Sequence, residues 1–394
     1  MTDHMREYSR RQFLKVAGAA GAAVGIGGIA AACSTAATPA PATAAPTSAS
    51  SAAATAAATA AASAPPTGTF NWMTWGDHWY QAQVDAIAAT NNIKVNSTLF
   101  SDNIDAYTKV KQVGGQLDMV SGDALWVPHY FESGLIEAWD INSLKVAKQL
   151  YSIAREFPIW TKPEGYLGYP FGWSPVQIYY DPKHVTPDPT SWDLLLDPKY
   201  KKRIVVENQP VEIMAYMGKF TGAKNAYSMT PDEIATAKEA AKKLKPNILK
   251  LADQATDTIA LLKTGEAWIA TGNLGTDIRV KDQGGPDLKV FTPKEGTIGW
   301  MDSEMVVKGG TNQNLIFPFL ELAEQAEYIA ANFMLNGRPL FNEAAYKILV
   351  NQGQQDRADR YLYNKPETVH TMDLKGPGLS TQAVIDAWNE VWAG

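Results

Sequence analysis

The sequence predicts a two-lobed α/β protein, and three observations support this fold class. Segments with the two-residue alternation of strands are interleaved with segments of helical periodicity from residue 70 to residue 140. A second run of the same kind extends from residue 171 to residue 301. The part able to fold, residues 67–394, is too long for one ordinary hydrophobic core. Two α/β units, each with its own sheet, explain all three.

The first unit has strands and helices in strict alternation. They are predicted as a strand at 70–75, a helix at 79–90, a strand at 93–99, a helix at 104–113, a strand at 117–120 and a helix at 127–133. This order favours a parallel sheet, in which ligands bind outside the carboxyl ends of the strands.

The rest of the chain gives a second series of elements. Strands are predicted at 177–180, 203–206, 267–271 and 305–307, and helices at 211–220, 231–244, 258–264, from 273 onward, 314–333, 338–349 and 382–392. In the last helix Trp388 and Trp392 stand at helical spacing, so both indoles are expected to pack.

The N-terminal segment is predicted to direct export and anchoring rather than to fold. The stretch SRRQFLK at 9–15 has the twin-arginine pattern, and an uncharged Gly/Ala-rich run continues to residue 32. Cys33, the only cysteine, follows three alanines, which predicts a signal peptide at 1–32 and a lipid on Cys33 that holds the protein on the membrane. A chance cysteine after a transmembrane helix is the alternative. Residues 33–67 are mostly Ala, Thr, Ser and Pro, which is typical of a flexible tether.

Composition excludes some classes of function. The formal net charge is −6, so the chain has no basic balance suited to nucleic acid. The sequence contains no G-x-S-x-G, HExxH or phosphate-binding glycine loop, and the five histidines lack metal-ligand spacing. Tyr179 and Tyr180 could suggest iron capture, but adjacent residues of a strand face opposite sides, which favours packing. Neither a metal nor a cofactor is expected.

Acids and indoles gather where the strands of the first unit end. Trp75 and Asp77 follow the first strand, and Asp123 and Trp126 follow the third. The carboxyl ends of parallel strands meet at one edge, so both pairs are expected at a ligand site. Capping of the following helices is an equally good explanation of the two aspartates, and the two roles are compatible.

The stretch TPKEGTIGWMDSEMV at 292–306 points to the chemistry of the ligand. Asp302 stands two residues after Trp300, so on an extended segment both side chains lie on the same face. An aromatic wall beside a carboxylate suits an alkyl ammonium. A core tryptophan followed by a turn-capping aspartate is the alternative. Glu207 and Glu212 flank a strand-to-helix turn and could face either the cleft or solvent.

The chain resembles a known family. Twin arginines, a lipid-accepting cysteine, a tether and two α/β lobes are similar to bacterial extracellular solute-binding lipoproteins of ABC importers. More narrowly, PKEGTIGWMDS at 293–303 resembles a stretch of the spermidine/putrescine-binding proteins, and NWMTW at 71–75, GLI at 134–136, and TSWDLL with PKYK within 190–201 match their order.

The resemblance implies a type II periplasmic-binding-protein-like fold with two hinge crossovers, near 169–173 and 300–302. It implies lobe 1 at 68–171 plus 302–350, and lobe 2 at 172–301 plus 351–394. A monomer would hold a polyamine between the lobes and deliver it to a membrane permease, without catalysis. The expected ligand-binding residues are Trp75, Asp77, His78, Asp123, Trp126, Trp173, Glu207, Glu212, Trp300 and Asp302.

Other solutes stay open, because this chain lacks aromatic residues that the family often has near Gly272, at Leu125 and near Asn351. A shorter diamine, an amino-acid-like cation or another organic cation would suit such a site. A receptor for a neutral or anionic solute such as a sugar, and a lipid-anchored hydrolase, are the alternatives of a different kind.

Overall fold

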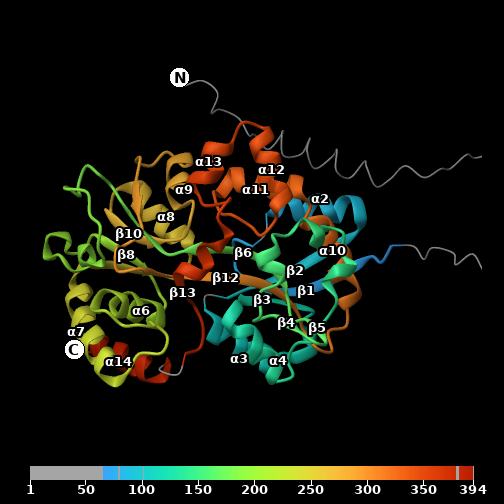
Figure 1. Cartoon of the computed structure of the whole chain (residues 1–394), viewed down its shortest axis with the longest axis horizontal. Coiled ribbons are helices and arrows are strands. Elements are labelled where there is room, and N and C mark those ends of the chain that lie inside the picture. The colour runs from blue at the N-terminus through green and yellow to red at the C-terminus, as the bar shows by residue number, and fades with distance from the viewer. Residues whose placement is uncertain (1–64, 79, 101, 379–380, 394) are drawn as a thin grey trace, which may run out of the picture.

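The computed structural model describes residues 65–78, 80–100, 102–378 and 381–393. The expected signal peptide, Cys33 and almost all of the tether lie outside the described residues. Figure 1 shows two α/β halves side by side, with strand β12 running from one into the other. The two-lobed α/β architecture expected from the sequence is therefore the architecture of the protein.

The first half is built on a six-stranded sheet in which β13, β12, β3, β1 and β2 are neighbours and β6 also pairs with β12. β1 is parallel to β2 and β3, as predicted, whereas β12 runs antiparallel to β3 and β6. The bounds of these strands are Gly68–Thr74 for β1, Ile93–Leu99 for β2, Met119–Asp123 for β3, Tyr169–Pro175 for β6, Thr297–Val306 for β12 and Met372–Leu374 for β13.

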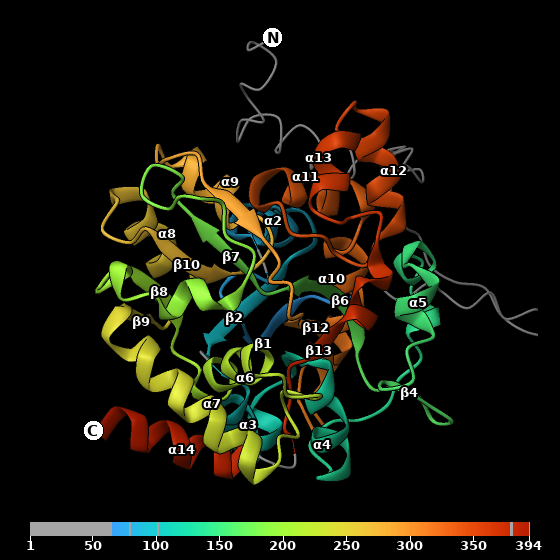
Figure 2. The same ribbon diagram turned by 60° about the vertical axis from the view of Figure 1, so that its left-hand side comes forward.

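The second half has a five-stranded sheet in the order β11, β7, β10, β8 and β9, and Figure 2 brings it forward. Its strands are β7 at Gln177–Tyr180, β8 at Ile204–Glu207, β9 at Ile248–Ala252, β10 at Ile269–Gly272 and β11 at Lys289–Phe291. A small hairpin joins β4 (Thr161–Lys162) to β5 (Gly165–Tyr166).

Helices cover both sheets. Their bounds are Gln81–Asn91 for α2, Asn103–Val113 for α3, Val127–Glu132 for α4, Ser152–Arg155 for α5, Pro210–Thr221 for α6, Pro231–Leu244 for α7, Ala255–Thr264 for α8, Thr276–Asp282 for α9, Ile316–Ala323 for α10, Ala326–Asn336 for α11, Glu343–Asn351 for α12, Gln355–Arg360 for α13 and Thr381–Ala393 for α14. None of these described helices has the length and apolarity needed to cross a membrane.

Local chemistry explains the best-predicted elements. Helix α7 has the predicted bounds because Thr230 and Glu233 form a reciprocal capping box and proline follows the cap. Strand β2 also has the predicted bounds, and left-handed Asn92 separates it from α2.

Two helix predictions were wrong. The expected helix at 314–333 is broken into α10 and α11, because Gln83 and Asn342 donate hydrogen bonds to the carbonyls of Ala323 and Glu324 at the break. The expected helix at 338–349 begins only at Glu343, where the Asn342 side chain accepts the amide of Ala345. Long-range side-chain contacts, which periodicity does not detect, set both boundaries.

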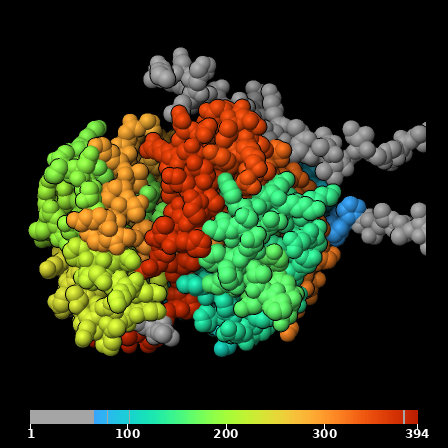
Figure 3. Space-filling model, viewed as in Figure 1, coloured from blue at the N-terminus to red at the C-terminus, as the bar shows by residue number. Residues whose placement is uncertain are grey.

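The C-terminal residues contribute to both halves. Strand β13 joins the first sheet through β12, while α14 lies beside α7 and packs on it and on α6 (Figures 1 and 2). In the space-filling view of Figure 3 the red C-terminal residues run between the two halves. The lobe boundaries given above stay a prediction. Of the two indoles in α14, Trp388 is buried, whereas Trp392 is 44% exposed and lies between Trp388, on which it stacks, and the ammonium of Lys245, so the expectation that both pack was half right.

Two large apolar clusters form the cores, one under each sheet. Strand β12 contributes to both, with Met301, Met305 and Val306 in the first and Ile298 in the second. Strand β6, paired with β12, leads directly into β7 of the second sheet. These two strands carry two crossovers between the halves, close to the positions expected from the sequence, and the chain crosses once more between β13 and α14.

Candidate functional site

A cleft of about 300 Å³ lies where the two sheets approach each other. The first sheet and the turns after it supply one wall, and the second sheet with its turns supplies the other. The polar and aromatic lining residues used below are Trp75, Asp77, Asp123, Glu207, Asn273, Arg279, Trp300, Asp302, Arg338 and Lys375.

Every second residue of this part of β12 lies on the same face of the strand, and these residues are Trp300, Asp302 and Glu304. Trp300 and Asp302 both line the cleft, as the two-residue spacing predicted. The indole Nε1 of Trp300 donates to Oδ1 of Asn273 at 2.9 Å, which ties the strand to the turn after β10. The alternative of a purely structural pair is thus not what the geometry supports.

His78 lies behind this wall and bridges two carboxylates of β12. Its Nε2 is 2.8 Å from Oδ2 of Asp302, and its Nδ1 is 2.8 Å from Oε1 of Glu304. Burial on its own would lower the pKa of His78, but the hydrogen bonds to Asp302 and Glu304 outweigh it and raise the pKa to about 9. His78 is therefore an imidazolium at neutral pH. The carboxylate of Glu304 also accepts a hydrogen bond of 2.6 Å from the hydroxyl of Ser121.

Asp302 lines the cleft next to Asp123. Its Oδ1 has almost no accessible surface, and a hydrogen bond between the two carboxyls contributes to the raised pKa of Asp123. Asp123 stands opposite it in the β3–β12 register and receives one hydrogen bond, from Nδ2 of Asn103 at 2.8 Å. Burial raises the pKa of Asp123, and the neighbouring Asp302 raises it further. Two carboxyls thus share one corner of the cleft, and the pair favours a proton or a cation between them.

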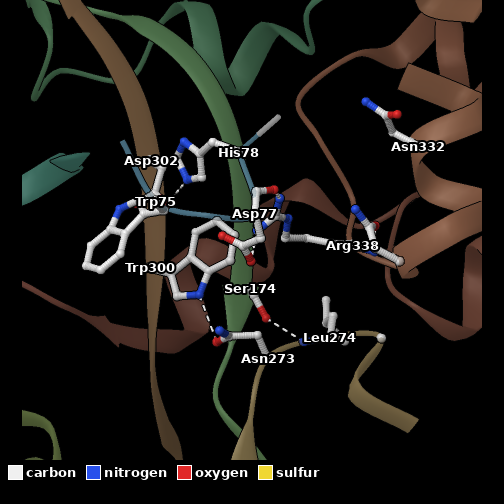
Figure 4. A network of polar contacts seen from close by, with 12 residues as sticks. Trp75, Asp77, His78, Ser174, Asn273, Leu274, Trp300, Asp302, Asn332 and Arg338 are labelled. Atoms are coloured by element: carbon white, nitrogen blue, oxygen red, sulfur yellow. Dashed lines mark hydrogen bonds and ion pairs between the residues drawn. The ribbon is translucent and has the colours of Figure 1, made fainter. Parts of the chain in front are cut away.

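Arg338 neutralises Asp77 on the far side of Trp300. It binds the Asp77 carboxylate through Nη1 and the Asp77 carbonyl through Nη2, and Figure 4 shows the two residues side by side. Burial raises the pKa of Asp77, but Arg338, together with His78 and Arg279, lowers it by more. The Arg338 guanidinium also lies 5.6 Å from the Trp300 ring centre and 5.5 Å from that of Phe171.

Lys375 neutralises the acids at the turn after β8. Its Nζ is 3.6 Å from Glu207 and 3.7 Å from Glu212, and the lysine is 5% exposed. Burial raises the pKa of Glu212 even though Lys375 opposes the shift. Burial disfavours charge on Lys375, but Glu212 and Glu207 together raise its pKa.

Asp77 and Asp123 do not cap the helices that follow them. The N-cap of α2 is Tyr80, which has no side-chain cap, and the turn after Asp123 has none either. The carboxylates instead make the tertiary contacts described above. Helix capping therefore does not explain Asp77 and Asp123, and both residues line the cleft.

The ten predicted site residues lie in four different places. Six of them line the cleft, namely Trp75, Asp77, Asp123, Glu207, Trp300 and Asp302. Trp126 and Glu212 line a second cavity, of about 390 Å³, which shares Gln209 with the cleft. His78 supports the wall from behind. Trp173 was wrongly placed at the cleft, because it is fully buried and stacks on Phe341 on the opposite face of β6.

Sequence reasoning missed the cations of the cleft and one carboxylate. Arg338 fell inside a predicted helix, and Arg279 and Lys375 had no neighbouring motif. Glu304 could have been found, because it continues the two-residue spacing of Trp300 and Asp302.

Tyr179 and Tyr180 pack in the two different clusters that flank their strand, as predicted. No group of three or more potential metal ligands occurs among the described residues.

Comparison with known proteins identifies relatives over most of the chain. Residues 82–357 match the family described as "Bacterial extracellular solute-binding protein", and residues 7–27 match the twin-arginine translocation signal. The spermidine/putrescine-binding periplasmic protein of Salmonella typhimurium is 25% identical over 319 residues, covering 78% of this chain and 86% of that protein.

Solved structures share the fold at low sequence identity. A lipoprotein of Treponema pallidum superimposes with a TM-score of 0.68 at 17% identity, over 82% of this chain and 99% of that one. A binding protein of A. tumefaciens, in complex with agropinic acid, gives a TM-score of 0.65 at 18% identity over 83% and 99%. The fold is that of the type II periplasmic binding proteins, as expected.

Proposed function

Because this chain belongs to the bacterial extracellular solute-binding proteins, we propose that it captures a small organic amine in the interlobe cleft. The solute carries at least one ammonium group, as the polyamines and amino-acid-like cations do. The protein then delivers the solute to the permease of an ABC importer and performs no reaction on it. The name of the Salmonella relative supports an amine ligand.

One observation carries the proposal: the carboxyls of Asp302 and Asp123 stand opposite each other in the register of β3 and β12, and both residues line the cleft. Two buried carboxyls side by side disfavour a second negative charge, which is why Asp302 raises the pKa of Asp123. An ammonium placed between Asp302 and Asp123 replaces the proton that the carboxyl pair otherwise favours. Trp75 and Trp300 lie beside this position and offer their ring faces to the carbon chain.

A ligand screen on the purified protein tests the proposal. Thermal shift with diamines, spermidine, amino acids and sugars reports any ligand that binds the folded state, and calorimetry then gives the affinity. We expect the amines to raise the melting temperature and the neutral sugars to have no effect. Stabilisation by sugars alone would contradict the proposal.

The Asp302→Asn variant locates the amine, and Glu304→Gln is its matched control. Both variants remove one carboxylate from His78, but only Asp302 lines the cleft. One charge-assisted contact is worth about 1.5–3 kcal/mol, so Asp302→Asn should weaken amine binding at least tenfold. Glu304→Gln should lower stability without a comparable loss of affinity. Equal losses in both variants would remove Asp302 from the site.

The N-terminal segment matches the signal of the twin-arginine route, which exports the protein. The proposal adds that acylated Cys33 anchors the chain and that residues 33–67 serve as its tether. Fractionation of cells should find the protein with the membrane and the Cys33→Ser variant in the soluble exported fraction. Membrane association that survives this substitution would refute the lipid anchor.

A further inference from the structure

Building on the proposed function, we infer that the solute is amphoteric: its amine binds at Asp302 and Asp123, and an anionic group such as a carboxylate binds at Arg279 and Arg338. The favoured solutes are then amino-acid-like molecules with charges of opposite sign at their two ends. A diamine presents an ammonium at both ends and is disfavoured.

Arg338 has a donor that the protein does not use. The residue is 5% exposed and lines the cleft, and its Nε is buried without an acceptor among the described residues. Its two terminal nitrogens are fixed on Asp77, so the guanidinium cannot turn to satisfy Nε elsewhere. Arg338 therefore presents a fixed positive charge to an anionic group in the cleft, which it lines.

Arg338 also occupies ring faces that a second ammonium would need. Its guanidinium lies over Trp300 and Phe171, and Figure 4 shows Arg338 beside Asp77, close to the Trp300 indole. The carboxylate and the aromatic face that would bind an alkyl ammonium at this end are therefore already engaged by a cation of the protein itself.

Arg279 adds a second positive charge to the same part of the cleft. It is half-buried, and in the described part of the chain its hydrogen bonds go only to the carbonyl of Gly275 and the hydroxyl of Thr276, both at 3.4 Å. Those described residues place no carboxylate within ion-pair distance of it. Its charge acts on Asp77 across the cleft, which places it in the same electrostatic environment as Arg338.

Asn273 supplies a neutral donor between the two ends. Its Oδ1 accepts from the Trp300 indole, which leaves its NH₂ group as the donor, with no acceptor among the described residues. The cations Arg338 and Arg279 thus mark one end of the cleft, while the carboxyl pair of Asp123 and Asp302 marks the other. Such an arrangement orients a solute with opposite charges and repels one with like charges.

Matched pairs of probes that differ at one end test the inference by calorimetry. Butane-1,4-diamine is compared with 4-aminobutanoate, pentane-1,5-diamine with 5-aminopentanoate, and the dicarboxylates of the same length serve as the third class. We expect the amino acid of a pair to bind at least tenfold more tightly than the diamine. Diamines that bind as tightly as amino acids would overturn this inference and leave the proposed amine site intact. Binding of dicarboxylates alone would overturn both.

The Arg279→Gln variant isolates the anionic end. It should weaken amino acid binding at least tenfold and leave diamine binding unchanged or improved, so the discrimination disappears. Lys281→Gln is the matched control, because Lys281 stands on the same helix, 60% exposed, in an ion pair with Asp287. Unchanged discrimination in Arg279→Gln would refute the assignment, and loss of all binding in both variants would show damage to the helix instead.

Discussion

The two ends of the cleft differ in the sign of the charge that predominates. At one end the carboxyls of Asp302, Glu304 and Asp123 lie around His78, and Lys375 acts on Asp123 as a second positive charge. At the other end, Arg338 and Arg279 act on the carboxylate of Asp77. Because one end is acidic and the other is basic, the charges of a solute determine how it is oriented in the cleft.

The largest expected effect comes from removing the cation that bridges Asp302 and Glu304. In His78→Gln the carboxylates of Asp302 and Glu304 lose the charge that lies 2.8 Å from each. Breaking a buried ion pair costs about 3–5 kcal/mol, so we expect a loss of that size in urea unfolding. His184→Gln is the control, because that half-exposed ring stacks on Trp268 and lies 3.9 Å from a single carboxylate, Asp181, so the change should alter stability by less than about 0.5 kcal/mol. Similar losses in both would contradict the bridging role.

The same cation gives stability a pH dependence. Its pKa of about 9 in the folded protein exceeds the ordinary value of 6.5, so the stabilisation is complete below 6.5 and disappears as pH rises through 9. A shift of that size corresponds to about 3 kcal/mol. Glu324, whose pKa burial raises from the ordinary 4.5 to about 8, also lowers stability as pH rises between those two values, so unfolding must be compared between wild type and His78→Gln. Parallel pH curves for the two proteins would refute this prediction.

Asp123 makes affinity for the amine depend on pH. Its pKa is raised by burial and by Asp302, and an ammonium binds best to the ionised form. Amine binding should therefore strengthen with rising pH, by up to about tenfold per pH unit, and level off above the pKa of Asp123. Calorimetry in buffers of different ionisation enthalpy should detect protons released on binding. In Asp123→Asn the release should vanish, and its persistence there would assign the proton to another group.

The smallest expected effect concerns Asn273, whose side chain lies between the two ends of the cleft and binds the Trp300 indole. Asn273→Ala removes the 2.9 Å hydrogen bond to the Trp300 indole and one donor facing the cleft. A neutral hydrogen bond contributes about 1 kcal/mol, so affinity should fall about fivefold for amino acids and diamines alike. Asn208→Ala, which removes only a bond to Asp253, is the control. A selective loss for one probe class would place Asn273 at one end rather than between them.

Local sequence determined much of the fold and the acidic end of the site. The two-residue spacing of Trp300 and Asp302 placed both on one face of β12, since strand geometry fixes side-chain direction. The strand–helix order placed Asp77 and Asp123 at one edge, because parallel strands share their carboxyl ends. The same spacing would have revealed Glu304. These inferences depend only on neighbours along the chain.

What the tertiary structure alone decided is how those charges are balanced. Arg338, Arg279 and Lys375 reach the cleft from segments far from its acids in sequence, and no periodicity links them. The positions of Trp173 and His78 also depend on tertiary packing. Trp173 lies in the core, and His78 lies behind the wall of the cleft. Short-range geometry thus determined which acids meet at the cleft. Long-range packing determined which cations meet them, because charge balance depends on distances that only the folded chain sets.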